Sequence, residues 1–385
     1  MENFINYSPF PALLFDSLDQ NDQGFSTLVA RISYELDPQR GMLTLCDDQG
    51  ELVEQDEHYG EPGRSSVRRE SDLAPYKPKM DVVINATAWA PANKPTSKFV
   101  VGAAIGQHVR LINVYGERIW RKGIGYWSLS EPKPLLSLPL RYENAQGGYY
   151  ALNDGQTWAS PTNTVGIGWL SAEANKALTL QKLSAPQLEL LPHPIKKIDD
   201  THLPAGFGFI GRGWQPRLQQ AGTYDERWKE TRHPFLPADF SFNYWCGAHP
   251  WLQFPLPEPL TFIPFKLKNL ISAASKADQE VFFSLPVETL FAFVTTTAGA
   301  GVSIDLRLDT VVVDMEAAQV NATYRAVFSE ELDAALTELR FIEKDQRQSM
   351  VEKAMRQREN PEEKDFLPLP PSLFEYSYQE SKDGR

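Results

Sequence analysis

Short apolar runs separated by turn residues dominate the chain, and they predict β-strands over most of its length. FSTLVARISYEL (25–36) mixes β-branched and apolar residues with polar ones, as half-buried strands do. Three runs near residue 100 are separated by Pro, Asn and Gly, which predicts an antiparallel meander: DVVINATAWAP (81–91), SKFVVGAAIG (97–106) and HVRLINVYGERIW (108–120). Strands resume near residue 280 with EVFFSLP, TLFAFVTTT, VSIDLRLDTVVVD and QVNATYRAVF, at hairpin spacing.

Two segments have helical character. LSAEANKALTLQKL (170–183) is rich in helix formers and predicts a short helix. From Ser329 we expect a long helix over 329–360, with Ser329 as its N-cap and two glutamates in its first turn. Its apolar face would consist of Leu332, Leu336, Leu339 and Ile342, and Pro361 would end it before a Pro-rich tail at 361–385.

Together these elements predict a mainly β fold. We expect antiparallel sheets forming a sandwich or open barrel, with long Pro- and Gly-rich loops and a C-terminal helix. Residues 1–328 would form one β-rich domain, or two sub-domains at about 1–150 and 151–328. Long loops within a compact domain are uncommon and usually functional.

Composition narrows the classes of function. The chain has 29 prolines, 11% aromatic residues and a net charge of −12, which argues against binding nucleic acid or an anionic membrane. Two cysteines without C-x-x-C spacing argue against a disulfide framework or a zinc site. No membrane-spanning apolar run or signal-peptide pattern is present, so we expect a cytoplasmic protein.

Several catalytic or cofactor motifs are incomplete. Gly206-x-Gly208-x-x-Gly211 matches a dinucleotide fingerprint, but nearby prolines leave no place for the required helix. Gly301-Val-Ser303 lacks the closing glycine of a serine elbow. The six histidines follow no metal-ligand spacing. We therefore expect no cofactor and no metal, and we interpret Asp81, near Lys77 and Lys79, as an ion-pair or turn residue.

Carboxylates flanked by aromatic rings offer the best case for an enzyme. Asp225 or Glu226 with Asp239 could form the acid pair of a glycosidase, with Trp214, Trp228 and Trp245 stacking on a sugar. The structural interpretation is that Asp225 caps a short helix with Glu226 in its first turn. Arginines close in sequence would then pair with these acids: Arg217, Arg227 and Arg232. This interpretation is the favoured one, and the carbohydrate-active alternative stays open.

Six separated blocks resemble one bacterial family of unknown function. They are SDLAPYKPKMDVVINATAWAP (71–91), VYGERIW (114–120), LPLRYENAQGG (138–148), PAGFGFIGRGWQPRLQQAGTYDERW (204–228), HPFLPADF (233–240) and FFSLP (282–286). The family's members resemble adaptors or chaperones that accompany PAAR-type effectors of type VI secretion systems. The resemblance covers about residues 10–328, with departures at Thr164, Ile167 and Tyr324 and around 241–253.

The resemblance implies binding without catalysis. The expected partner is the PAAR-like region of a cognate effector, with the spike protein as a further one, and the expected role is to help load the effector onto the spike in the cytoplasm. Seven residues are candidates for the motif core or for partner contact, with a structural role favoured for the core ones: Trp214, Arg217, Gly222, Thr223, Tyr224, Asp225 and Trp228. Rigid loops carrying Trp, Tyr and Arg suit such an interface.

Overall fold

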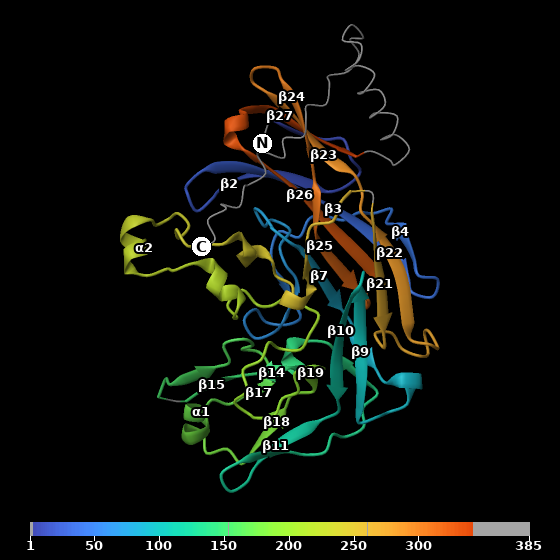
Figure 1. Ribbon diagram of the computed structural model, residues 1–385, viewed down its shortest axis with the longest axis vertical. Coiled ribbons are helices and arrows are strands. Elements are labelled where there is room, and N and C mark those ends of the chain that lie inside the picture. The colour runs from blue at the N-terminus through green and yellow to red at the C-terminus, as the bar shows by residue number, and fades with distance from the viewer. Residues whose placement is uncertain (1–2, 153, 260, 342–385) are drawn as a thin grey trace.

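Strands dominate the computed structural model, which describes residues 3–152, 154–259 and 261–341. The mainly β prediction is confirmed. In Figure 1, strands from both ends of the chain share the upper part of an elongated molecule, and residues in the middle of the chain form the lower part. A segment carrying a short helix, α2 (Glu226–Thr231), stands out to one side.

The largest sheet joins the two ends of the chain. Its order is β2 (Ala12–Leu18), β3 (Gly24–Asp37), β26 (Gln319–Ser329), β25 (Arg307–Asp314), β7 (Met80–Asn85) and β20 (Gln253–Phe254), with β4 (Met42–Leu45) also pairing with β3. The strand predicted at 25–36 is confirmed as β3. Every residue of β7 is buried, which explains its continuous apolar run.

A second sheet corrects the predicted meander. Its order is β19 (Leu188–Leu190), β10 (His108–Tyr115), β9 (Lys98–Ile105), β21 (Phe262–Lys268) and β22 (Glu280–Pro286). β9 and β10 form the expected antiparallel hairpin. The first of the three predicted runs contains β7, which instead pairs in parallel with β25 in the largest sheet. Sequence proximity predicted the hairpin, whereas the partner of β7 comes from more than 200 positions away.

The predicted long helix from Ser329 is wrong over its described part. Ser329 caps only a 3-10 turn, η6 (Glu330–Leu332), which ends at Asp333 in the left-handed region. The chain then forms β27 (Ala334–Phe341), placed between β1 (Phe4–Asn6) and β23 (Leu290–Thr296), with β24 (Gly301–Asp305) beyond. Pairing on both sides and burial of Leu339 outweigh helix propensity here. The rest of the predicted helix and the tail lie outside the described residues.

Smaller sheets complete the fold, and several of them lie in the lower part of the molecule (Figure 1). They are β11 (Arg118–Lys122) with β12 (Trp127–Leu129) and β18 (Lys182–Ala185), and the pairs β8 (Thr87–Trp89) with β13 (Ser137–Pro139), β14 (Gln146–Gly147) with β17 (Ile167–Gly168), β15 (Tyr149–Ala151) with β16 (Thr157–Ala159) and β5 (Glu57–His58) with β6 (Val67–Arg69). Two single 3-10 turns join them, η1 (Pro91–Asn93) and η2 (Tyr142–Asn144). The short helix predicted at 170–183 is α1 (Ala172–Ala177), capped by Ser171.

Three apolar clusters lie between and beside these sheets. The main core takes residues from the three largest sheets, including Leu28, Val83, Ile112 and Leu339. A separate cluster around Trp120, which is buried, supports the lower part. The sheets are open and mixed, and the described strands close no barrel.

Candidate interaction site

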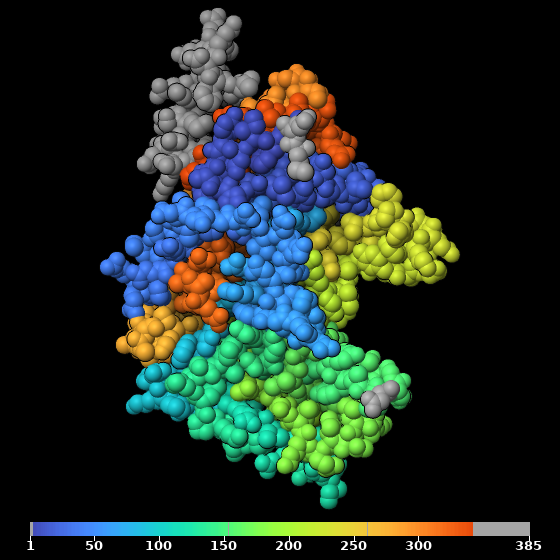
Figure 2. All heavy atoms as spheres, turned by 180° about the vertical axis from the view of Figure 1, so that it is seen from behind, coloured from blue at the N-terminus to red at the C-terminus, as the bar shows by residue number. Residues whose placement is uncertain are grey.

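The seven candidate residues divide between the body and a projecting segment. Trp214 and Arg217 are buried in the body. The other five lie on residues 222–239, which we call the arm: it leaves the body after η3 (Arg217–Ala221) and returns at η4 (Phe242–Trp245). The arm carries α2 and stands clear of the body in the ribbon view, and the space-filling view from behind shows it projecting from the side of the molecule above the lower part (Figures 1 and 2).

The base of the arm is closed by its own backbone and side chains. Gly222 has φ of 80°, and a Cβ there would lie 2.8 Å from the Pro237 side chain, so only glycine fits this approach. Thr223 donates its N–H and its hydroxyl to the Asp239 carboxylate, at 2.9 and 2.7 Å. These hydrogen bonds hold the pKa of Asp239 below its usual value. Two separate sequence blocks, AGTYDERW and HPFLPADF, are thus joined in space by these hydrogen bonds.

Asp225 has the capping role predicted by the structural interpretation. Its carboxylate accepts a hydrogen bond from the Trp228 N–H at 2.8 Å and begins α2, with Glu226 in the first turn. The predicted pairing with arginines is wrong. Glu226 pairs with Lys229, and Arg232 pairs with Asp22 of the body. Closeness in sequence does not decide which side chains meet. On a helix, residues three or four positions apart are neighbours, whereas residues two positions apart do not face each other.

Aromatic rings form a ladder along the arm. Tyr224 packs edge-to-face on Trp228, with ring centroids 4.6 Å apart, and Trp228 contacts the His233 ring at 5.3 Å. The Trp228 indole N–H donates to the Phe235 carbonyl at 2.9 Å. Tyr224 is 54% exposed and Phe235 43% exposed. The arm therefore presents large rings to solvent on a backbone that its own contacts hold in place.

The arm is also fastened to the largest sheet. Arg232 donates to the Gln20 carbonyl at 3.0 Å and to the Asp22 carboxylate at 2.7 Å, in the turn between β2 and β3. Beneath the arm lies a small cluster whose buried members are Phe25, Phe240 and Phe242. Because Phe25 belongs to β3, this packing connects the arm directly to the sheet.

Arg217 holds the root of the arm inside the body. Its guanidinium binds both oxygens of Glu70, in the loop before β7, and donates to the Tyr244 and Ile210 carbonyls. Both members of this ion pair are buried. Burial alone would raise the pKa of Glu70, but the facing Arg217 charge holds it below its ordinary value. Sequence analysis missed Glu70 because it lies 147 positions from its partner.

Trp214 has a structural role next to this ion pair. It packs edge-to-face on Tyr142 at 5.6 Å and donates its indole N–H to Thr164 at 3.0 Å. The glycines of the apparent dinucleotide fingerprint serve the same packing. A Cβ on Gly206 would lie 2.4 Å from the Tyr142 ring, and one on Gly211 would lie 2.9 Å from the Trp214 ring. The motif therefore makes room for aromatic rings.

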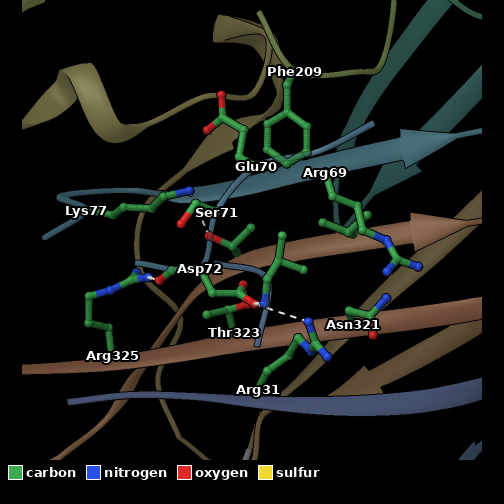
Figure 3. Close-up of a pocket in the computed structure, with 13 residues that line it drawn as sticks. Arg31, Arg69, Glu70, Ser71, Asp72, Lys77, Phe209, Asn321, Thr323 and Arg325 are labelled. Atoms are coloured by element: carbon green, nitrogen blue, oxygen red, sulfur yellow. Dashed lines mark hydrogen bonds and ion pairs between the residues drawn. The ribbon is translucent and has the colours of Figure 1, made fainter. Parts of the chain in front are cut away.

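Beneath the arm's root, charged side chains cross the buried face of the largest sheet (Figure 3). Asp72 accepts from Arg31 on β3 at 3.1 Å and from Thr323 on β26 at 3.0 Å. Arg325, also on β26, binds Asp309 of β25. The network encloses a cavity of about 30 Å³, which has room for roughly one water.

The network continues to β7, where it confirms the ion-pair interpretation of Asp81. Lys77 donates to Asp81 at 2.7 Å and to Thr310 of β25 at 2.9 Å. Burial would lower the pKa of Lys77, but the Asp81 carboxylate raises it, so the lysine stays charged. These charges meet only because of the order of the strands in the sheet. The signal in the sequence was the presence of charged residues within apolar strands such as β3 and β25.

The acids of the carbohydrate-active alternative lie on the outer surface of the arm. Asp225 and Asp239 use their carboxylates to cap a helix and to close a loop, and all three acids are exposed. None of them lines the cavity enclosed by the buried network. Over the described residues, no group of His, Cys, Asp and Glu side chains is arranged to hold a metal ion. The described helices are all too short or too polar to cross a membrane.

The comparison with protein families gives a match over most of the chain. Residues 21–325 match the family described as an uncharacterized protein conserved in bacteria, DUF2169. No match was found among curated proteins or among solved structures. The matched range contains the arm, the Arg217–Glu70 pair and the strands that carry the buried network. The chain therefore belongs to the DUF2169 family of uncharacterized bacterial proteins.

Proposed function

We propose that the protein is a cytoplasmic adaptor of a bacterial type VI secretion system, which binds the PAAR-like region of a cognate effector and helps load it onto the spike. The observation that carries the proposal is the arm. It exposes Tyr224 and Phe235 while hydrogen bonds and ring contacts fix its conformation. A pre-ordered segment loses little conformational entropy when it binds, and aromatic side chains contribute most to binding energy.

Other observations favour a binding role over a catalytic one. Asp225 and Asp239, the acids best placed in sequence for catalysis, are engaged in holding the arm together. The candidate core residues Trp214 and Arg217 connect the arm's root to the body. The resemblance of six sequence blocks to PAAR-associated adaptors supplies the identity of the partner class.

The test is co-expression with the PAAR-type effectors encoded near the gene, followed by affinity capture. We expect a stable complex with one of them. Replacing Tyr224 and Phe235 together by alanine should weaken it by about 30-fold or more, the effect of removing interface hot spots of about 2 kcal/mol. The matched control replaces Tyr149 and Phe282, which are 58% and 50% exposed on distant strands.

Two outcomes would contradict the proposal, and each would contradict a different part of it. If no PAAR-type effector is captured by the native protein, the adaptor function is wrong. If the effector is captured equally by the arm variant and the control variant, the arm is not the contact surface.

A further inference from the structure

A polar cavity of about 230 Å³ lies at the root of the arm and is partly open to solvent. Its lining includes Arg217 and Gln220 of η3, Asn243 of η4, and Gln253 of β20. The cavity thus sits between the two short helices through which the arm leaves and rejoins the body. It has room for roughly seven waters, enough for one amino-acid side chain with its adjoining peptide group.

The charge of this cavity is positive. No acidic residue is in its lining, and Lys79 lines it without an ion pair among the described residues. Arg217 is already neutralised by Glu70. Burial raises the pKa of the Cys246 thiol to about 12, so the thiol adds no negative charge. One lysine charge is therefore available to an anionic group.

The cavity also offers uncommitted hydrogen-bonding groups. The side-chain oxygen of Asn243 is buried and has no hydrogen-bond partner among the described residues. Gln253 uses its N–H groups on the Cys246 and Ala248 carbonyls, which leaves its oxygen as an acceptor. The Gln220 side-chain amide makes no hydrogen bond with a described residue. Amide oxygens accept hydrogen bonds, and a peptide group beside a carboxylate supplies an N–H donor for them.

We propose that this cavity binds an acidic side chain together with the peptide group beside it. Lys79 pairs with the ligand's carboxylate, and the oxygens of Asn243 and Gln253 accept hydrogen bonds from the ligand's N–H groups. The inference extends the proposed function, because the arm and the cavity form adjoining surfaces and a partner held by the arm would place an aspartate or glutamate here. Charge-assisted pairing in a partly enclosed site gives the specificity.

The experiment titrates the isotopically labelled full-length protein with small probes and follows the side-chain amide signals of Gln220, Asn243 and Gln253 by NMR. The probes are acetyl-glutamate N-methylamide, its glutamine counterpart, free glutamate and inorganic phosphate. We expect the blocked glutamate to shift these signals and the glutamine probe to bind about tenfold more weakly or worse, since hydrogen bonds to charged groups are the stronger ones.

Lys79→Met should weaken binding of the blocked glutamate by the same factor. Lys94→Met changes another exposed lysine that has no ion pair with a described residue, and it should leave this binding unchanged. Both lysines are exposed, so neither change should alter thermal unfolding. Equal binding of both probes, or equal binding by both variants, would overturn the proposal. Tighter binding of free glutamate indicates a metabolite site, and tighter binding of phosphate a general anion site, and either refutes peptide recognition.

This result is separable from the test of the adaptor function. The probes bind without any partner protein, and effector capture uses arm residues outside the cavity lining. Probe binding without effector capture would leave the cavity assigned and the adaptor role wrong. Effector capture without probe binding would support the adaptor role and show that the cavity does not bind an acidic peptide group.

Discussion

Single residues decide how the arm is held in the body. Arg217 has five N–H groups, and four of its hydrogen bonds go to Glu70, Tyr244 and Ile210. The Glu70 carboxylate reaches it because Gly247 has no side chain: a Cβ there would lie 2.4 Å from a Glu70 oxygen. Because both charges are buried, each depends on the other to offset the loss of water.

Breaking this ion pair should be costly. We expect Glu70→Gln to lower the free energy of unfolding by about 3–5 kcal/mol, because it leaves the buried Arg217 charge uncompensated. The double variant Glu70→Gln with Arg217→Met should recover part of that loss. Urea unfolding monitored by tryptophan fluorescence measures both. A loss below about 1 kcal/mol in the single variant would show that the pair is exposed to water in solution.

His249 should make the free energy of unfolding depend on pH in the acid range. Burial, assisted by the nearby Arg110 charge, lowers the pKa of His249 to about 4. Its Nδ1 accepts a hydrogen bond from the Trp251 N–H, which begins η5 (Pro250–Leu252). Between pH 6.5 and 4 the unfolded chain binds a proton that the folded protein does not, so stability is complete above pH 6.5 and falls as the pH is lowered.

The expected loss over this range is about 3 kcal/mol. His249→Asn keeps an acceptor for the Trp251 N–H and cannot titrate, so it should remove this part of the pH dependence. Unfolding in urea at pH 7, 5.5 and 4.5 gives the comparison. If the native protein and the variant lose stability in parallel, His249 is not responsible.

At the scale of elements, the arm shows how a short helix is made by its surroundings. α2 has six residues, too few to be stable alone in water. It forms because Asp225 caps it, Trp228 is bonded to Phe235, and Arg232 fastens its end to the turn after β2. β27 shows the converse, because pairing on both of its edges makes a strand from Ala, Leu and Glu, which favour helix.

The cap can be tested apart from any catalytic role. Asp225→Ala should destabilise α2 by about 1 kcal/mol and speed amide exchange at Trp228 about fivefold, whereas Asp225→Asn, which can still accept, should change exchange little. Hydrogen exchange measured by NMR gives both rates. Equal acceleration in the two variants would mean that the charge, and not the hydrogen bond, begins the helix.

The whole molecule is held together by strands from both ends of the chain. β26 and β25 lie between β3 and β7, and the buried charges of Arg31, Asp72, Asp309 and Arg325 meet only when these four strands are in order. Parallel pairing of β7 with β25 requires the intervening segment to fold back over the sheet. The sheet that supports the arm therefore forms only when distant parts of the chain associate.

A fragment ending at residue 306 should fail to fold, because it lacks the two central strands and with them Thr323 and Arg325, which donate hydrogen bonds to Asp72. Circular dichroism and hydrogen exchange would show loss of the sheet. As a control, fragments 1–299 and 300–385, produced together, keep every strand and should reassemble, since the break falls in the turn between β23 and β24. An independently folded 1–306 would show that its core needs no C-terminal strands.

The sequence by itself determined what depends on near neighbours: the strand at 25–36, the hairpin of β9 and β10, the short helix near 172, and the cap at Asp225. Periodicity and capping are local, so they can be recognised from a few adjacent residues. Only the tertiary structure decided the partner of β7, the strand in place of a helix after Ser329, and the pairing of Arg217 with Glu70. These depend on contacts between distant segments, which propensity and spacing do not encode.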